Sequence, residues 1–204
     1  MRIYTRRGDD GTTGLLFGGR VPKTDPVIEA TGAVDEAQAA LGAARAELHR
    51  GSELDGILVG LERDLYVLMA ELATAPGNRH RLEGGRTLVT ASMVSALEER
   101  IDSLSGRFPP VTDFVVPGHD RVSALLDVAR TAVRRAERLA VPATFEGSLV
   151  GPYLNRLSDL AWTMARWQEH GDSLLSRTLV GGAGPGQSEA PGQLEAPGPS
   201  GTPG

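Results

Sequence analysis

The sequence contains no cysteine, which excludes disulfide bonds and thiolate metal sites. Its four histidines are scattered and form no spaced ligand pair, so we expect no structural zinc site. No apolar run approaches the length of a membrane-spanning helix, and the first residues lack the apolar stretch of a secretory signal. The cytoplasm is therefore the expected compartment, and a membrane is not an expected partner.

Lysine and arginine, 21 in total, are outnumbered by the 26 aspartates and glutamates. The formal net charge of -5 provides no global attraction to nucleic acid, so we expect no nucleic-acid partner and only a local site for any anion. Aromatic residues make up just 4% of the chain. Hydrophobic residues make up 40%, however, and 204 residues are enough for one domain with a full core.

The chain divides into three zones by composition. Residues 1–24 are rich in glycine, threonine and charge and show no clear period, whereas residues 25–178 carry long helical patterns. Residues 179–204 are mostly Gly, Pro, Ala, Gln and Glu. Such a segment cannot bury enough apolar surface to offset its ordering entropy. We therefore predict a disordered Gly/Pro-rich tail and assign it no function.

The middle zone predicts five helices. Asp25-Pro26 provides an N-cap followed by proline at the first helical position, while Pro76-Gly77, Gly106 and Pro142 mark later ends. No segment shows strong strand alternation. The pattern favours an all-α, up-and-down bundle. Its helices are expected at residues 26 to about 50, 54–75, 90–105, 120–141 and 148–170.

The fourth predicted helix carries a dense group of arginines beside its apolar stripe. Guanidinium groups bind polyphosphate oxygens in pairs, so this group is a candidate anion site. The alternative is a solvated face with i,i+4 ion pairs. Helical geometry places Arg130, Arg134 and Glu137 on the border of the stripe, within about 60°, and Asp127, Arg135 and Arg138 further round.

The fifth predicted helix places Tyr153 and its leucines on a core face. The opposite face is expected to carry Asn155, Asp159, Trp162 and Arg166. A tryptophan among polar groups suggests contact with a ligand or another subunit. The alternative is a singly exposed aromatic residue.

The N-terminal zone is rich in glycine and threonine. Glycines allow the backbone to approach an anion closely, and backbone N–H groups together with threonine hydroxyls can bind phosphate. The segment lacks the Gly-Lys-Ser/Thr ending of a Walker A loop and the strand–turn–helix context of a dinucleotide fingerprint. A flexible glycine-rich leader is the alternative.

Three blocks in this order carry a family resemblance. They are residues 4–23 continuing into 29–36, residues 114–118 followed by 129–138, and residues 153–159. Over roughly residues 3–170 the chain resembles the PduO-type ATP:cob(I)alamin adenosyltransferases, also called corrinoid adenosyltransferases. It departs from them at His119, where members often have glycine, and at Asp127, where many have histidine.

The resemblance implies a five-helix, ferritin-like bundle that assembles as a homotrimer, with ATP and cobalamin bound between subunits. Cobalt(I) attacks the ribose 5′ carbon of ATP and triphosphate leaves, with Mg²⁺ bridging phosphate oxygens. A cobalamin reductase and a cobalamin-dependent mutase are candidate partners. The alternative functions are a non-catalytic, ATP-dependent cobalamin escort or sensor, and a ligand-free trimeric scaffold.

The resemblance also implies roles for individual residues. Phe114 would lie under the corrin ring and replace the lower cobalt ligand; its alternative role is a loop anchor in the core. Asp35 and Arg130 would form an ion bridge across the subunit boundary. No protein side chain is expected as a metal ligand. The ATP-binding residues would be Thr5, Arg6, Arg7, Gly8, Thr13, Gly14, Lys23, Arg134, Arg135, Glu137, Arg138 and Asn155.

Overall fold

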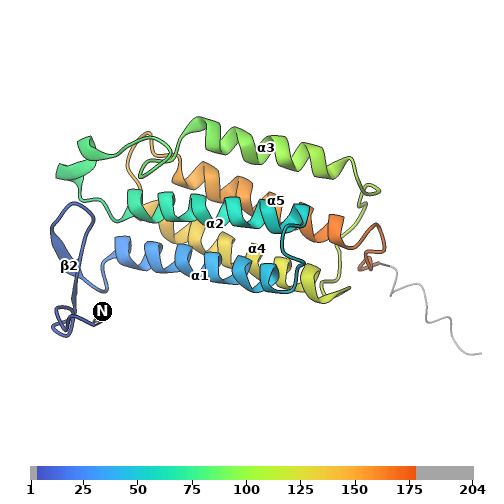
Figure 1. The fold of residues 1–204 in the computed structure, drawn as a ribbon, viewed down its shortest axis with the longest axis horizontal. Coiled ribbons are helices and arrows are strands. Elements are labelled where there is room, and N and C mark those ends of the chain that lie inside the picture. Colours follow the sequence, from blue (N-terminus) through green and yellow to red (C-terminus); the bar gives the residue numbers. More distant parts are fainter. Residues whose placement is uncertain (1–3, 178–204) are drawn as a thin grey trace, which may run out of the picture.

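The computed structural model describes residues 4–177, so the tail predicted for residues 179–204 lies outside the described part. The described chain is mostly helical, as predicted, and successive α-helices run in opposite directions (Figure 1). Two short 3-10 helices, η1 (Pro76–Arg81) and η2 (Val141–Ala143), join them. The α-helices are α1 (Pro26–Ala46), α2 (Glu53–Leu72), α3 (Ala91–Ser105), α4 (Arg121–Ala140) and α5 (Val150–Gln168).

The helix starts follow from capping residues in the sequence. The side chain of Asp25 accepts a hydrogen bond from the N–H of Val27, and Thr90 caps α3 in the same way. Asp120 accepts from two N–H groups of the first turn of α4, which confirms the predicted start there. The ends of α1 and α2 fall about four residues short of the prediction. Turns at residues 47–51 and a non-helical stretch at residues 73–75, just before η1, take their place.

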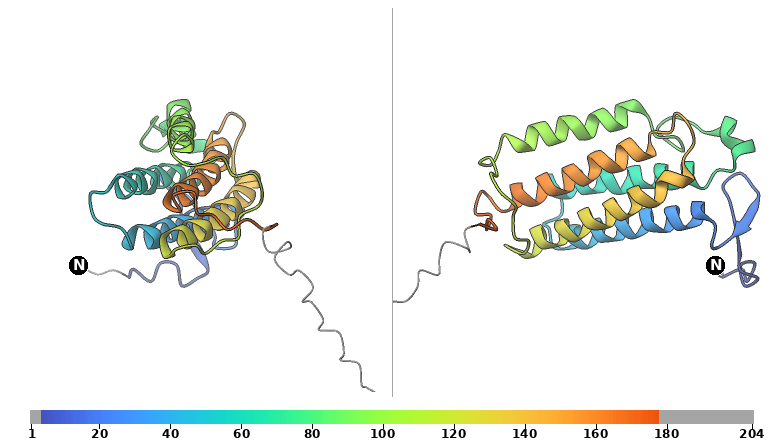
Figure 2. Two further views of the ribbon diagram at one scale, coloured as in Figure 1. Left: turned by 90° about the vertical axis from the view of Figure 1, so that its right-hand side faces the viewer. Right: turned by 180° about the vertical axis from the view of Figure 1, so that it is seen from behind.

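Small side chains allow α1 and α4 to approach closely. The predicted apolar stripe of α4 is buried, and α4 packs mainly against α1 and α5. The facing alanines of α1 are also buried, so little side-chain volume separates the two helices. Of the two other α-helices, α2 packs mainly against α1, and α3 lies on the outside and packs mainly against α5 (Figure 2).

The prediction of a chain without strands is wrong in the N-terminal zone. Strands β1 (Thr12–Gly14) and β2 (Arg20–Pro22) pair in antiparallel register near the start of α1 (Figure 1). Three residues are too few for an alternating pattern to register in the sequence. The Leu16 N–H donates to the carbonyl of Ala73 at 2.8 Å, which docks the hairpin on the end of α2.

None of the helices in residues 4–177 combines the length and apolar character that a membrane-crossing segment requires.

Candidate functional site

A pocket of about 650 Å³ opens where α4 begins and α5 ends. Its floor and walls combine apolar and charged groups from three parts of the chain. One side is the Pro-flanked loop at residues 111–117, which includes Phe114. The other sides come from Asp127 and Arg130 of α4, Trp162 and Arg166 of α5, and Arg177 beyond α5.

Phe114 presents its ring to solvent at this pocket. The side chain is 82% exposed, so the alternative of a loop anchor in the core is wrong for this chain. Its backbone, in contrast, is held: the N–H donates to the Asp113 carboxylate at 2.7 Å, and the carbonyl accepts from the Ser176 N–H at 2.8 Å. The pocket therefore contains a fixed apolar ring without a lone pair, free to be covered by a ligand.

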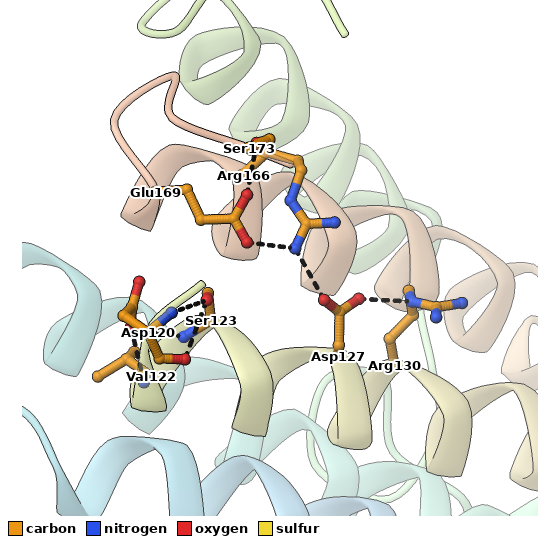
Figure 3. A network of polar contacts seen from close by, with 8 residues as sticks. All are labelled: Asp120, Val122, Ser123, Asp127, Arg130, Arg166, Glu169 and Ser173. Carbon is orange, nitrogen blue, oxygen red and sulfur yellow. Dashed lines mark hydrogen bonds and ion pairs between the residues drawn. The ribbon is translucent and has the colours of Figure 1, made fainter. Parts of the chain in front are cut away.

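A buried ion network forms the polar side of the pocket (Figure 3). The Arg166 Nη2 lies 2.7 Å from Asp127 Oδ2 and 2.7 Å from Glu169 Oε1. The second oxygen of Asp127 lies 3.1 Å from Arg130 Nε. Arg130 therefore enters the pocket with its guanidinium oriented by a carboxylate that is itself buried and paired.

The sequence placed two members of this network wrongly. Arg166 was expected on the polar face of its helix and Asp127 away from the core, yet they are only 1% and 5% exposed. The chain before α4 and the chain after α5 cover this end of the helices, which periodicity within one helix cannot reveal. Charged groups are tolerated there because each is paired. Trp162 is half-buried, and its ring centre lies 5.7 Å from the Arg166 guanidinium carbon.

The arginines further along α4 differ in their contacts. Arg135 pairs with Glu36 of α1, and Arg138 donates to the Arg134 carbonyl at 3.0 Å. Arg134 is exposed, and its guanidinium has no ion pair among residues 4–177. Its charge is available to an anion in a single chain, as is that of Arg138, which also forms no ion pair among these residues.

Glu137 and Asn155, both predicted to bind nucleotide, are brought together. The Asn155 side-chain amide donates to the Glu137 carboxylate at 3.0 Å, linking α4 to α5. The amide oxygen of Asn155 accepts from Arg156 at 2.9 Å. These two contacts fix the orientation of the amide beside the arginine group.

The N-terminal segment gathers most of its predicted ATP-binding residues. Thr5, Arg6 and Arg7 line one hollow with Tyr4 and are exposed. Gly8 lies against Lys23: a Cβ at this glycine would lie 3.3 Å from the lysine Nζ. Because Gly8 has no side chain, the side chain of Lys23 can lie across the N-terminal segment.

Hydrogen bonds tie this segment to the hairpin that follows it. Arg20 donates to the Arg7 carbonyl at 2.6 Å and to the Thr12 hydroxyl. The backbone N–H and hydroxyl of Thr12 hold the pKa of Asp10 below its ordinary value. Strand β1 contains the predicted residues Thr13 and Gly14.

Asp35 is exposed on α1. Within the described part of a single chain no ion pair joins it to Arg130, which pairs with Asp127 instead. The predicted bridge across a subunit boundary therefore stays a prediction. Nowhere in residues 4–177 do three His, Asp or Glu side chains converge as a metal-ligand set.

Comparison with known proteins identifies relatives of this chain. A family model described as cobalamin adenosyltransferase matches residues 3–168. The corrinoid adenosyltransferase of Mycobacterium tuberculosis is 42% identical over 189 residues, which span 86% of this chain and 97% of that protein. The human corrinoid adenosyltransferase is 34% identical over 81% of this chain and 68% of its own length.

Solved structures give the same relationship in three dimensions. A phenylalanine-to-histidine variant of the PduO-type ATP:corrinoid adenosyltransferase from Lactobacillus reuteri, complexed with cobalamin and ATP, superposes with a TM-score of 0.76. It is 29% identical, and the match covers 86% of this chain and 97% of that one. An arginine-to-lysine variant of the same protein, complexed with ATP, gives a TM-score of 0.74. The chain described above belongs to the cobalamin adenosyltransferase family.

Proposed function

We propose that this chain transfers the 5′-deoxyadenosyl group of ATP to the cobalt of cob(I)alamin, giving adenosylcobalamin and triphosphate. The observation that carries the proposal is the pocket lined by both the exposed ring of Phe114 and the paired guanidinium of Arg130. One helical turn further along α4, Arg134 presents an available positive charge. An apolar platform in the loop before α4 and an anion-binding residue on α4 thus lie on either side of Arg130 along the chain.

The related structures support the assignment of these two residues. In the Lactobacillus reuteri protein, the substituted arginine follows the substituted phenylalanine by 20 positions. Phe114 and Arg134 have the same separation in this chain. Variants of that phenylalanine were complexed with cobalamin and ATP, and the variant of that arginine with ATP. We place the corrinoid on the Phe114 side, because an apolar ring suits the corrin, and the triphosphate on the Arg134 side, because a guanidinium suits phosphate oxygens.

The proposed chemistry needs no protein nucleophile. Cobalt(I) attacks the ribose 5′ carbon, the carbon–oxygen bond to triphosphate breaks, and the leaving group takes the electron pair. Arg134 stabilises the charge that develops on triphosphate, and the fixed amide of Asn155 helps to orient the nucleotide. The rate enhancement comes from holding cobalt, carbon and leaving oxygen in line.

Phe114 serves the step before transfer. A lower axial ligand that donates to cobalt opposes reduction of cobalt(II) to cobalt(I). An aromatic ring in that position excludes water and provides no lone pair. Because the ring is exposed, a corrin can cover it without unpacking the core.

The remaining features of the proposal concern assembly and partners. The chain would form a five-helix bundle that assembles as a homotrimer in the cytoplasm, with Asp35 of one subunit reaching Arg130 of the next. The N-terminal segment, including Arg6, Arg7 and Lys23, would close over ATP. Magnesium would enter bound to phosphate oxygens, since residues 4–177 provide no cluster of three candidate ligands. A cobalamin reductase would supply the electron, and a mutase would receive the product.

The deciding experiment follows the corrinoid spectrum of the purified chain with ATP, magnesium and a chemical reductant under anaerobic conditions. We expect conversion of cob(I)alamin to adenosylcobalamin with one triphosphate released per product. Binding of ATP and cobalamin without conversion would instead support an escort or sensor. Binding of neither would leave only a scaffold.

A further inference from the structure

The chain beyond α5 folds back along the loop that contains Phe114. We call residues 173–177 the C-terminal strap. The N–H of Val116 donates to the Leu174 carbonyl at 2.8 Å, and the N–H of Ser176 donates to the Phe114 carbonyl at 2.8 Å. The Arg177 Nε lies 2.9 Å from the Asp113 carboxylate. The strap therefore holds the loop at Phe114 and on both sides of it.

A tight reversal sets the path of the strap. His170 and Gly171 both have left-handed backbone angles, with φ of 52° and 94°. A Cβ at Gly171 would lie 2.9 Å from Pro109 Cδ, closer than real contacts allow. Position 171 therefore requires glycine for two reasons: its backbone angle is left-handed, and a side chain there would collide with the loop that leads to Phe114.

Buried ion pairs connect the strap to the pocket. The Ser173 hydroxyl donates to Glu169 Oε2 at 2.5 Å, and the other oxygen of Glu169 binds Arg166. Arg166 binds Asp127, which in turn orients Arg130 (Figure 3). Glu169 and Arg166 are each 1% exposed, so these contacts are shielded from water.

We propose that Ser173, Glu169 and Arg166 are positioning residues that fix the Phe114 loop relative to Arg130. The inference rests on the proposed function. The ring of Phe114 is 82% exposed and has little packing of its own to locate it. Its position must therefore come from the backbone, which the strap holds. Arg166 Nε has no acceptor among the described residues, so the two carboxylates on Nη2 alone provide its hydrogen bonds.

Ser173→Ala tests this inference, because it cuts the strap from Glu169 while leaving the buried ion pairs intact. We expect kcat for adenosyl transfer to fall about tenfold and KM for ATP to change less than about twofold. The four-coordinate cobalt(II) signal in magnetic circular dichroism should fall with kcat. Ser173→Thr retains the hydroxyl and should restore both.

The matched control is Ser148→Ala at the other end of α5. Ser148 also donates to a buried carboxylate, Glu71, at 2.5 Å. Its loss should lower the thermal midpoint like Ser173→Ala, yet leave kcat and the cobalt signal unchanged. If Ser173→Ala kept both readouts, or Ser148→Ala lost them equally, the positioning role would be refuted while transfer by the wild type still stood. An inactive wild-type chain would refute the proposed function, and this inference with it.

Discussion

Replacing Phe114 by alanine separates the cobalt chemistry from the stability of the fold. Because the side chain is 82% exposed, its truncation should change the free energy of unfolding by no more than about 0.5 kcal/mol. A corrin ring that covered the side chain would gain about 1.5–3 kcal/mol from its burial. We therefore expect the corrinoid dissociation constant of Phe114→Ala to rise roughly ten- to hundredfold.

Turnover at saturating corrinoid should fall as well, because alanine leaves room for water beneath the cobalt. ATP affinity should stay unchanged, since the arginine group lies further along α4. Isothermal titration calorimetry measures both affinities, and magnetic circular dichroism reports the four-coordinate cobalt(II). Val141→Ala is the control, because Val141 is also an exposed apolar residue, at 71%. If Phe114→Ala kept its rate and its signal, the role of the ring in the mechanism would be wrong.

Three further predictions concern Arg134, Asp35 and Asp55. Arg134→Ala should raise the ATP dissociation constant roughly tenfold or more, the loss of a charge-assisted contact of about 1.5–3 kcal/mol; an unchanged value by calorimetry would refute the assignment. Asp35→Asn should weaken trimer assembly or activity in sedimentation and turnover assays, unless an assembled structure places Asp35 far from Arg130. The Gly51 N–H and the Arg45 guanidinium hold the pKa of Asp55 below its ordinary value, so its contribution to stability is lost as pH falls through that lowered pKa. The thermal midpoint should therefore drop below about pH 4, and less so in Asp55→Asn.

Local signals predicted most of the fold. The N-caps at Asp25 and Asp120 and the apolar stripe of α4 follow from neighbouring residues alone, and the structure confirms them. The hairpin of β1 and β2 escaped prediction because its pairing depends on a turn with Gly18 and Gly19 at positive φ, not on periodicity.

The sequence predicted less of the candidate site than of the fold. The family resemblance named Glu137 and Asn155 as nucleotide-binding residues, and the structure places their side chains in contact. The network of Arg166, Asp127 and Glu169 could not be predicted, because their burial depends on how segments distant in sequence cover one end of the helices. In the sequence Arg166 reads as part of a polar helix face, because its buried partner Asp127 lies 39 residues away.

The proposed function gives α4 a part in aligning two substrates of different character. Arg130 and Arg134 are separated by four residues, about 6 Å along the helix axis, and lie on the same side of it. The first lines the pocket that contains Phe114, and the second is exposed and would bind triphosphate. In the proposed reaction the 5′ carbon of ATP must lie between the cobalt and the leaving oxygen. If α4 contacts both substrates as proposed, this helix would fix their separation along its axis, and the C-terminal strap, which holds the Phe114 backbone, would fix the other face of the corrin. In this proposal alignment depends on α4 and the strap, which are connected through the buried contacts of Asp127 with Arg166, Arg166 with Glu169, and Glu169 with Ser173.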